Sequence, residues 1–398
     1  MQRAVVFGAG KMACGLLGYI LRQSGCEVLF VARRRDVVDA INRRAGYRLT
    51  LLGKRAERHA IRGCRACSID DAGEVVDQVA RADVVMTGIG IDRLGAVAPL
   101  IAQGLWRRSQ MAGARPLNVI ACENLPGAGA YLRHQIVSAA DVGQAMAVNA
   151  VGGFAAALTR RIMTGGALEH GELSFTVSGE PDLVVDRKGL KQPLPHLAGV
   201  RFTSEFAALV LRKLYTLNCG QAVAAYLGYR AGCATLPEAA SHPRVAPAVR
   251  AAVGEARAAL KARLPHHALE IERDAAQALG EIARAGLGDT VRRVARDPRR
   301  KLTPLERLVG PARLAHKHGL PHRHLCLGIA AALAYDEPAD SEAQALQREI
   351  AVDGVEQILT VDCGLLPHED LARTVKQQWL RLLDSGHPPA VSPAGAFI

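Results

Sequence analysis

A lysine and two amide side chains lie at close spacing within one apolar stretch of the chain. In the segment from residue 212 to 222, Lys213, Asn218 and Gln221 are surrounded by leucine, tyrosine and alanine. At about 100° per residue on an α-helix, Gln221 lies about 80° and Asn218 about 140° round from Lys213, so the polar groups share one side. Burial and nearby positive charge lower the pKa of an ammonium group, which makes such a lysine a candidate general base. The alternative is a structural lysine whose head reaches solvent.

A glycine-rich turn follows the first apolar run of the chain. The sequence GAGKMA at residues 8–13 fits the pattern G-x-G-x-x-G/A and opens a helical pattern. Gly8 permits the tight turn, Gly10 lets the backbone approach a pyrophosphate, and Ala13 permits close packing of helix on strand. A helix N-terminus also favours negative charge. We therefore predict a dinucleotide site. Its residues are Gly8, Ala9, Gly10, Lys11 and Met12.

The end of the second strand-like run distinguishes between two nicotinamide cofactors. Sites that prefer NAD place an Asp or Glu there to accept hydrogen bonds from the ribose. This chain has Arg33 and Arg34 instead, and guanidinium groups pair well with a 2′-phosphate. We predict that NADP(H) is favoured over NAD(H); the alternative is that these arginines only begin a solvated helix. Thr87 and Gly90, at the end of the fourth strand, are expected beside the cofactor.

Alternating strand-like and helical patterns position this turn. Apolar runs at 4–7, 27–31, 84–87 and 118–122 alternate with helical patterns such as 11–23 and 36–44. This order predicts an α/β fold, a doubly wound and mainly parallel Rossmann sheet with helices on both faces. The runs 173–177 and 183–185 are expected to form a hairpin that extends this domain.

The pattern becomes helical after about residue 195. Helical periodicity is found at 204–229, 247–262, 269–285, 304–318, 324–334, 341–353 and 368–384, and Pro and Gly separate these stretches. A chain of 398 residues suits two domains. We predict a Rossmann dinucleotide-binding domain with extra strands over 1–195, a mainly α-helical substrate and catalytic domain over 196–384, and a flexible tail over 385–398.

Composition narrows the classes of partner. The formal net charge is +12, but aromatic residues are only 4% and we find no nucleic-acid-binding motif, so an anionic cofactor or substrate explains the charge more simply. No apolar run spans a bilayer, and the N-terminus lacks the features of a signal peptide. We expect a cytoplasmic monomer or homodimer that binds a small molecule, and neither nucleic acid nor membrane.

The cysteines and histidines give little support for a metal site. The 9 cysteines are scattered, and buried free thiols are the expected state for most of them. Cys64 and Cys67 have the spacing of a redox or zinc pair, but no second pair answers them. His318 and His322 belong to a local histidine cluster that Pro321 interrupts, which disfavours regular ligation from one helix. No metal is expected.

Several segments together resemble the polyol-specific long-chain dehydrogenases, the mannitol dehydrogenase family. That family carries K-x-x-x-x-N-x-x-H on one helix, and Lys213 and Asn218 match it. The segments 118–124, 289–302, 319–322 and 328–332 are also similar, so the likeness covers nearly the whole chain. The resemblance implies hydride transfer with nicotinamide and no metal. It assigns Lys213 as the acid–base and assigns Asn124 and Asn218 as hydrogen-bonding partners of the substrate oxygen.

Three positions depart from the family pattern. Gln221 replaces the family histidine and cannot titrate. Arg160 replaces the acidic residue of the family's Val-Asp-Arg-Ile segment, and Cys14 stands where the glycine loop usually continues to an arginine. The first two changes fall near the substrate site that the resemblance implies. They favour a different and more anionic substrate.

A basic segment supplies further candidates for anion binding. At helical spacing Arg293, Arg296 and Arg300 fall on one side, in a segment that is similar to the family. An uncompensated cluster of guanidinium groups would be costly, so an anion such as phosphate is expected to complete it. A solvated basic face is the alternative. The predicted substrate-binding residues are Arg160, Arg293, Arg296 and Arg300.

These observations predict an NADPH-preferring reductase, or reversible dehydrogenase, that interconverts a phosphorylated keto-sugar and its polyol. Two alternatives stay open. One is a reductase of an unphosphorylated keto-acid or sugar conjugate in specialised metabolism. The other is a nucleotide-binding regulator that has lost catalysis. Lys213, Asn124 and Asn218 favour an enzyme, whereas Gln221 and Arg160 favour the alternatives.

Overall fold

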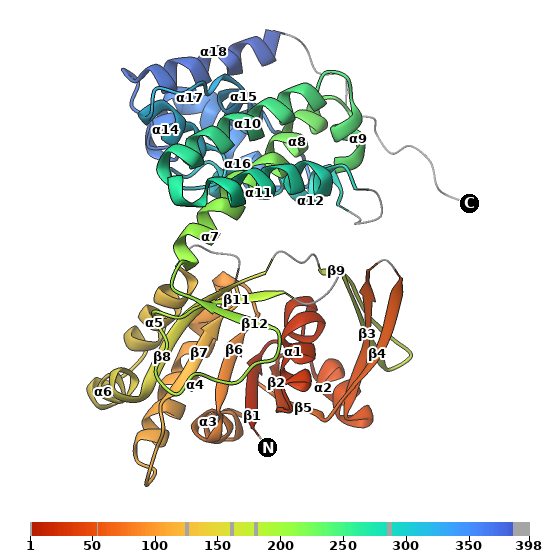
Figure 1. Ribbon diagram of the computed structural model, residues 1–398, viewed down its shortest axis with the longest axis vertical. Coiled ribbons are helices and arrows are strands. Elements are labelled where there is room, and N and C mark those ends of the chain that lie inside the picture. Colours follow the sequence, from red (N-terminus) through yellow and green to blue (C-terminus); the bar gives the residue numbers. More distant parts are fainter. Residues whose placement is uncertain are drawn as a thin grey trace. The chain divides into compact units, whose positions relative to one another are not determined.

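The computed structural model describes residues 2–53, 55–123, 127–159, 163–178, 182–284 and 289–384. Contacts divide the chain into two compact units, Met1–Ala207 and Ala208–Ile398, and Figure 1 shows the elements of each. The division lies inside the helix α7 (Phe206–Lys213). The two units have separate hydrophobic cores.

The N-terminal unit is built on a mainly parallel sheet. Within the described residues its strand order is β12-β11-β8-β7-β6-β1-β2-β5. The strands from β8 to β5 are all parallel to their neighbours, in the 3-2-1-4-5-6 order of dinucleotide-binding folds. β11 runs antiparallel to β8, and β12 runs parallel to β11. The strands are β1 (Arg3–Phe7), β2 (Glu27–Ala32), β5 (Cys64–Ser68), β6 (Val84–Thr87), β7 (Leu117–Ala121), β8 (Gly152–Leu158), β11 (Leu183–Asp186) and β12 (Val200–Thr203).

Apolar residues on both faces of the central strands explain this sheet. Val6 and Met86 belong to one core cluster, and the alternate residues Val5 and Val85, which point to the opposite face, are also buried. Parallel strands buried on both faces read as continuous apolar runs, and the predicted α/β fold is confirmed. The helices of this unit are α1 (Gly18–Gln23), α2 (Arg35–Arg44), α3 (Ala72–Arg81), α4 (Leu94–Ser109), α5 (Ala128–Ser138) and α6 (Val142–Val151), with the short helical turns η1 (Ala13–Leu17) and η2 (Ile91–Arg93).

A second sheet, of order β4-β3-β10-β9, packs against α2 and η1 (Figure 1). Its strands are β3 (Gly46–Leu52), β4 (Ala56–Arg62), β9 (Met163–Glu169) and β10 (Glu172–Ser178). The expected hairpin of 173–177 with 183–185 is wrong, because β10 pairs with β9 and β3 whereas β11 pairs with β8 and β12. The partner strand β9 carries Gly165 and Gly166, and glycine weakens the strand signal in a sequence.

The C-terminal unit is helical, as predicted, and α8 lies at its centre. α8 is buried at nearly every position and packs against α9, α10, α12 and α15; a helix that is apolar all round is a core helix. The helices are α8 (Cys219–Arg230), α9 (Leu236–Ser241), α10 (Ala246–Arg263), α11 (Ala268–Ile282), α12 (Val291–Ala295), α13 (Pro298–Lys301), α14 (Val309–Lys317), α15 (Arg323–Leu333), α16 (Ser341–Asp353), α17 (Val355–Val361) and α18 (Asp370–Asp384), with the turns η3 (Leu214–Asn218) and η4 (Pro265–His267).

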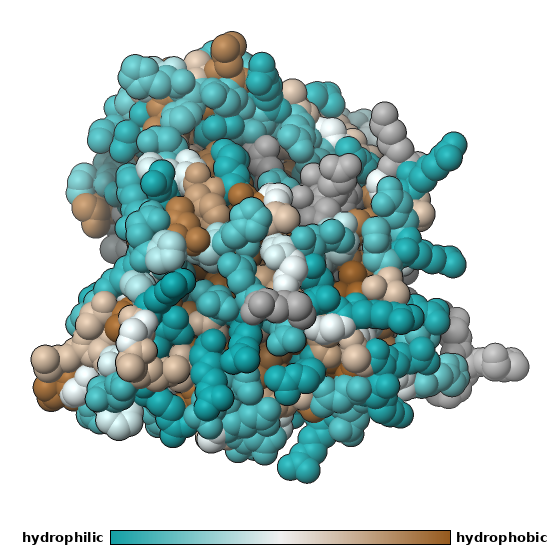
Figure 2. Space-filling model, turned by 60° about the horizontal axis from the view of Figure 1, so that its bottom comes forward, coloured by the Kyte–Doolittle hydropathy of each residue, from teal (hydrophilic) through white to brown (hydrophobic). Residues whose placement is uncertain are grey.

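Two helical stretches differ from their prediction. The stretch 204–229, expected as one helix, is divided by the π-helical turn η3 into α7 and α8. The helix expected from residue 304 begins at Val309. Among the described residues, no helix is long and apolar enough to cross a membrane. Hydrophilic residues cover most of the face seen in Figure 2.

The cysteines are free thiols, and all except Cys233 are buried, which confirms the expected state of most of them. Burial raises the pKa of Cys64 to about 11 and that of Cys67 to about 12, so neither thiol is activated near neutral pH. Among the described residues, no three His, Cys, Asp or Glu side chains are placed together to hold a metal ion.

Candidate cofactor-binding and catalytic residues

The glycine loop has the conformation that a pyrophosphate site requires. Gly8 has φ of +107°, and its N–H donates to the Val31 carbonyl at 2.8 Å. A Cβ on Gly8 would lie 2.9 Å from the Ile89 side chain, whereas a Cβ on Gly10 would meet no atom within 4 Å. The side of Gly10 is therefore open, as a backbone that approaches phosphates needs to be. The helix begins at once, because the Cys14 N–H donates to the Gly10 carbonyl at 2.9 Å.

The second sheet holds the helix that starts at this loop. In the π-helical turn η1 the Gly18 N–H reaches back to the Ala13 carbonyl, and the Tyr47 hydroxyl of β3 donates to the Cys14 carbonyl at 2.6 Å. A Cβ on Gly18 would lie 2.3 Å from the Tyr47 oxygen, so glycine is needed for this contact. Cys14 itself is fully buried, and burial raises the pKa of its thiol well above the usual value. Its side chain therefore belongs to the core.

The two arginines after β2 have different partners. Both are exposed, but the Arg34 guanidinium makes a two-bond ion pair with Asp36, with Nε at 3.0 Å from Oδ1. Among the described residues, Arg33 has no carboxylate partner. The Arg33 guanidinium can therefore pair with an added anion directly, whereas Arg34 would first have to leave Asp36.

A buried carboxylate joins the two loops at the ends of β6 and β7. Glu123 is 6% exposed; its Oε2 accepts from the Thr87 hydroxyl at 2.7 Å, and its Oε1 accepts from the Ile89 N–H at 3.2 Å. Burial raises the pKa of Glu123, and the hydrogen bonds oppose that effect. Thr87 is itself fully buried, and its hydroxyl bond to Glu123 supports the loop that carries Gly90. Glu123 was not among the predicted site residues, although an acidic residue two positions after the fully buried strand β7 is a usable signal. Asn124 lies outside the described residues.

The π-helical turn η3 changes the geometry of the lysine helix. Lys213 ends α7 and is half-buried, Asn218 is buried, and Gln221 is half-buried in α8. The Cys219 N–H reaches the Leu214 carbonyl, five residues back. Such a turn holds more residues than an α-turn, so it rotates Asn218 toward the face of Lys213. The 140° separation expected for an unbroken α-helix is therefore wrong, and the polar groups lie closer in phase than predicted.

Two contacts fix this turn in the C-terminal unit. The Thr216 hydroxyl donates to the Arg212 carbonyl at 2.6 Å, a back-bonding contact that often bends helices. The Arg212 guanidinium pairs with Asp274 of α11 at 2.7 Å, and their side chains are only 9% and 4% exposed. This buried pair, missed by the sequence analysis because its partners are far apart in the chain, anchors the residue that precedes Lys213.

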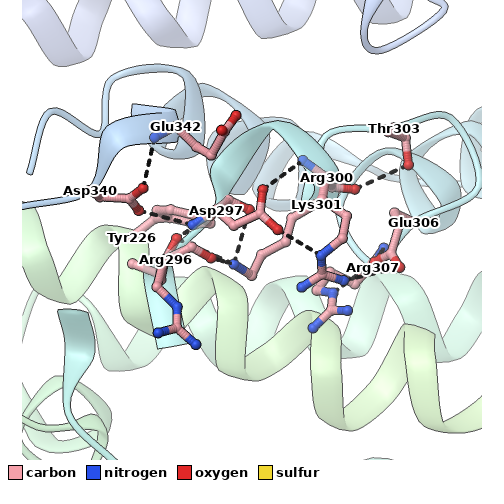
Figure 3. A network of polar contacts seen from close by, with 11 residues as sticks. Tyr226, Arg296, Asp297, Arg300, Lys301, Thr303, Glu306, Arg307, Asp340 and Glu342 are labelled. Atoms are coloured by element: carbon pink, nitrogen blue, oxygen red, sulfur yellow. Dashed lines mark hydrogen bonds and ion pairs between the residues drawn. The ribbon is translucent and has the colours of Figure 1, made fainter. Parts of the chain in front are cut away.

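The basic segment is largely compensated by carboxylates. Arg293 pairs with Asp289, and Arg300 pairs with Asp297 at 2.8 Å and lies 3.8 Å from Glu306. The expectation of an uncompensated cluster is therefore wrong for Arg293 and Arg300. Arg296 is exposed and, within the described residues, pairs with no carboxylate; in Figure 3 its guanidinium points away from the network. Arg160 lies outside the described residues.

Lys301 lies at the centre of this network (Figure 3). Its ammonium group donates to the carbonyls of Ala295 at 3.3 Å and Asp297 at 3.2 Å, and also to that of Arg296. It lies 5.9 Å from the centre of the Tyr226 ring. Burial, followed by the charge of neighbouring arginines, lowers its pKa to about 7. These contacts fold the chain from α12 into α13, so Lys301 orients the segment that presents Arg296.

Comparison with known proteins shows the family of this chain. The family described as "Mannitol dehydrogenase Rossmann domain" matches residues 2–199, and "Mannitol dehydrogenase C-terminal domain" matches residues 206–379. The chain belongs to the mannitol dehydrogenase family. It is 35% identical over 382 residues to mannitol-1-phosphate 5-dehydrogenase of Brevibacillus brevis, covering 95% of this chain and 98% of that relative. This mannitol dehydrogenase family protein is an enzyme, an NAD(P)-dependent dehydrogenase or reductase that acts on a CH–OH/ketone pair.

Solved structures show the same fold in other proteins. Mannitol 2-dehydrogenase of Pseudomonas fluorescens, in a ternary complex with NAD and D-mannitol, matches 97% of this chain and 92% of its own with a TM-score of 0.73 and 16% identity. Substrate-free D-sorbitol dehydrogenase matches 96% and 93% with a TM-score of 0.74 and 15% identity. The Rossmann and helical units of this mannitol dehydrogenase family member are thus confirmed as its fold.

Proposed function

We propose that this enzyme is an NADPH-preferring reductase, or reversible dehydrogenase, that interconverts a phosphorylated keto-sugar and its polyol. The observation that carries the proposal is the 35% identity to a mannitol-1-phosphate 5-dehydrogenase over 95% of the chain, together with Lys213 and Asn218 on the π-turn helix. Residues 1–195 bind the cofactor in this proposal, and residues 196–384 supply the acid–base and the substrate contacts.

Lys213 is the proposed proton donor in reduction and acceptor in oxidation. When bound, the nicotinamide gives or takes the hydride at the carbonyl carbon. Lys213 then gives or takes the proton at the oxygen, so that a ketone, a hydride and a proton balance an alcohol. Asn218 and Asn124 hydrogen-bond the same oxygen and stabilise its developing negative charge. Gln221, which cannot titrate, orients a substrate hydroxyl.

Cofactor binding is assigned to the glycine loop and to the edge beside it. Gly8, Ala9, Gly10, Lys11 and Met12 would hold the pyrophosphate, and Gly90 lies in the loop that Thr87 and Glu123 support. The exposed Arg33, with no acidic partner among the residues described, supports the preference for a 2′-phosphate. Arg34 contributes only if it exchanges Asp36 for that phosphate.

The substrate phosphate is assigned first to Arg296 and Arg160. Arg296 has no carboxylate to neutralise it within the described residues, whereas Arg293 and Arg300 are already paired. A phosphate that met Arg293 or Arg300 would therefore compete with Asp289 or Asp297. This arrangement favours one close guanidinium contact from the basic segment and not three.

The test compares matched keto-sugars with and without phosphate, each with NADPH and with NADH. We expect the phosphorylated substrate to be favoured by more than about tenfold in kcat/KM, a difference of about 1.4 kcal/mol. Arg296→Ala and Arg160→Ala should each remove much of that difference, while Arg348→Ala, an exposed arginine elsewhere on the C-terminal unit, should not. Equal efficiency for the neutral sugar in the unmodified enzyme would overturn the assignment of a phosphorylated substrate.

The paired state of Arg293 and Arg300 supports a second candidate. A reductase of an unphosphorylated keto-acid or sugar conjugate needs fewer free guanidinium groups than a sugar-phosphate enzyme does. In that case the same assay shows activity on neutral or carboxylated substrates, and the loss of Arg296 has little effect on kcat/KM.

A further inference from the structure

The C-terminal unit contains a cavity that the proposed reaction does not use. Its volume is about 710 Å³, and it lies between the α7–η3 segment, α14, the Pro304–Leu305 loop and the start of α18. Small-molecule sites commonly measure about 300–1,000 Å³. The cavity is thus large enough for a metabolite.

This cavity lies on the side of the catalytic helix that faces away from Lys213. Leu211 and Tyr215 line it, and they stand two residues before and two residues after the lysine. Leu211 lies in α7, where a residue two positions from the lysine is about 200° round the helix. A ligand in the cavity would therefore touch the helix that carries Lys213 without occupying the lysine's own face.

The floor of the cavity is apolar and fixed. Tyr215 and Leu371 are buried, and the Tyr215 hydroxyl donates to the Leu305 carbonyl at 3.3 Å. Gly310 leaves room for the tyrosine, because a Cβ there would lie 2.2 Å from its oxygen. Leu305 itself is 79% exposed at the rim. An apolar group placed here would cover a leucine that is otherwise in water.

The rim is positively charged and incompletely neutralised. Of its acidic residues, Asp370 pairs with Arg373, and Glu369 accepts the Leu366 N–H at 3.3 Å. Three other rim cations, Arg263, Arg313 and Lys317, have no carboxylate partner in the described part of the chain.

Helix geometry alone does not account for these cations. Arg263 and Lys317 end α10 and α14, where the helix dipole favours positive charge. Arg313 sits within α14, four residues before Lys317, and like charges at that spacing repel each other. One N–H of the Arg313 guanidinium donates to the Gly364 carbonyl at 2.8 Å. The other N–H groups of this guanidinium are left to bind an anion.

We propose that this cavity binds an organic phosphate, meaning a phosphate ester with an apolar or aromatic body. The phosphate oxygens accept from Arg263, Arg313 and Lys317, since guanidinium forks match phosphate geometry. The body covers Leu305 and the Tyr215 side of the floor. A simple inorganic anion would leave the apolar floor wet, and an uncharged aromatic molecule would leave the three cations unmatched.

The test uses phenyl phosphate as probe, with phenol and inorganic phosphate as the matched halves. Calorimetric titration is run on the full chain saturated with NADPH, so that the dinucleotide site is filled. We expect phenyl phosphate to bind about tenfold more tightly than either half, and Arg263→Ala/Lys317→Ala to weaken it by about tenfold. The control is Arg250→Ala/Arg348→Ala, which removes the same charge at exposed positions that do not line the cavity and should leave binding unchanged.

Hydrogen exchange locates the bound probe. Protection of peptides that cover 211–219 and 309–317 supports the cavity. Protection confined to the N-terminal unit overturns the proposal, as does equal affinity for phenyl phosphate and inorganic phosphate. Unchanged affinity in Arg263→Ala/Lys317→Ala also overturns it. Arg296→Ala should retain probe binding, so this result is independent of whether the proposed substrate phosphate site is correct.

Discussion

Different residues hold the site in shape and carry the proposed proton transfer. Glu123 supplies two hydrogen bonds to the β6 loop from a nearly solvent-free position, whereas the half-buried Lys213 is the group proposed to move a proton. The sequence alone identifies Lys213, because the spacing from Lys213 to Asn218 matches the family motif. It does not show that the Thr87 hydroxyl donates a hydrogen bond to Glu123. The two residues are 36 positions apart in the chain and meet only because their strands are neighbours in the sheet.

The pH dependence of stability should reveal the state of Glu123. Because burial raises its pKa in the folded protein, the folded state binds a proton more readily than the unfolded state does. Stability contributed by this group therefore falls as pH rises from the ordinary glutamate pKa, about 4.3, through the raised value. In Glu123→Gln the amide keeps an acceptor for the Ile89 N–H and a donor for the Thr87 oxygen.

We expect the difference in unfolding free energy between Glu123→Gln and the unmodified enzyme to move in favour of the variant over this pH range. Urea titration at a series of pH values measures it. Glu123→Ala, which leaves the Thr87 hydroxyl and the Ile89 N–H without this acceptor, should cost about 1–3 kcal/mol at low pH, and its cost should also shrink as the pH rises. A pH-independent difference for Glu123→Gln would show that the carboxylate does not titrate in this range.

Removal of the proposed acid–base should separate catalysis from cofactor binding. Lys213→Ala is expected to lower kcat by about 10²–10⁴, with NADPH affinity unchanged because the glycine loop belongs to the other unit. Fluorescence titration and steady-state kinetics measure the two effects. Lys188→Ala, at an exposed lysine of the N-terminal unit, is the matched control. Retention of most of the activity in Lys213→Ala would make this lysine a structural residue.

At the scale of elements, sequence patterns predicted the regular parts and missed the irregular ones. Continuous apolar runs such as Val84–Thr87 were recognisable because both faces of a parallel sheet are buried. The strand β9, with its two glycines, gave no such pattern. The π-helical turns η1 and η3 also escaped, since each is held by a contact with a distant part of the chain: Tyr47 with Gly18 at η1, and Arg212 with Asp274 beside η3.

The turn η1 offers a direct test of this dependence. Gly18→Ala would place a Cβ 2.3 Å from the Tyr47 oxygen and 2.7 Å from Phe30, so we expect a loss of about 1–3 kcal/mol in unfolding free energy from overpacking. Tyr47→Phe should cost about 1 kcal/mol through the lost hydrogen bond to Cys14. Gly73→Ala in α3 is the control, because its Cβ would meet nothing within 4 Å and alanine favours a helix. If Gly18→Ala is as harmless as Gly73→Ala, the close contact does not define the turn.

At the scale of the whole chain, the proposed reaction is distributed over two units with separate cores. The sequence predicted two units from the change of periodicity near residue 195. It could not predict which of many arginines are free, because the partners of Arg212 and Arg299 lie 62 and 50 residues away. The 50 Lys and Arg residues therefore include several that are paired with carboxylates and are not free for ligands. Of the described arginines proposed for the cofactor and the substrate, Arg33 and Arg296 are the two without a carboxylate partner, because Arg34, Arg293 and Arg300 are paired.

The separate cores predict separate responses to the cofactor. We expect calorimetry to resolve two unfolding transitions, and NADPH to shift only the one that belongs to the N-terminal unit, where the glycine loop lies. At 100 times its dissociation constant, a ligand of the folded state stabilises that unit by about 2.7 kcal/mol.

NADH at the same concentration as NADPH should shift the N-terminal transition less, because it lacks the 2′-phosphate that Arg33 is proposed to hold. Arg33→Ala should reduce the NADPH shift to that of NADH, while Arg34→Ala should change it little, since Arg34 is paired with Asp36. Equal shifts from the two cofactors in the unmodified enzyme, or an undiminished NADPH shift in Arg33→Ala, would contradict the assignment of Arg33.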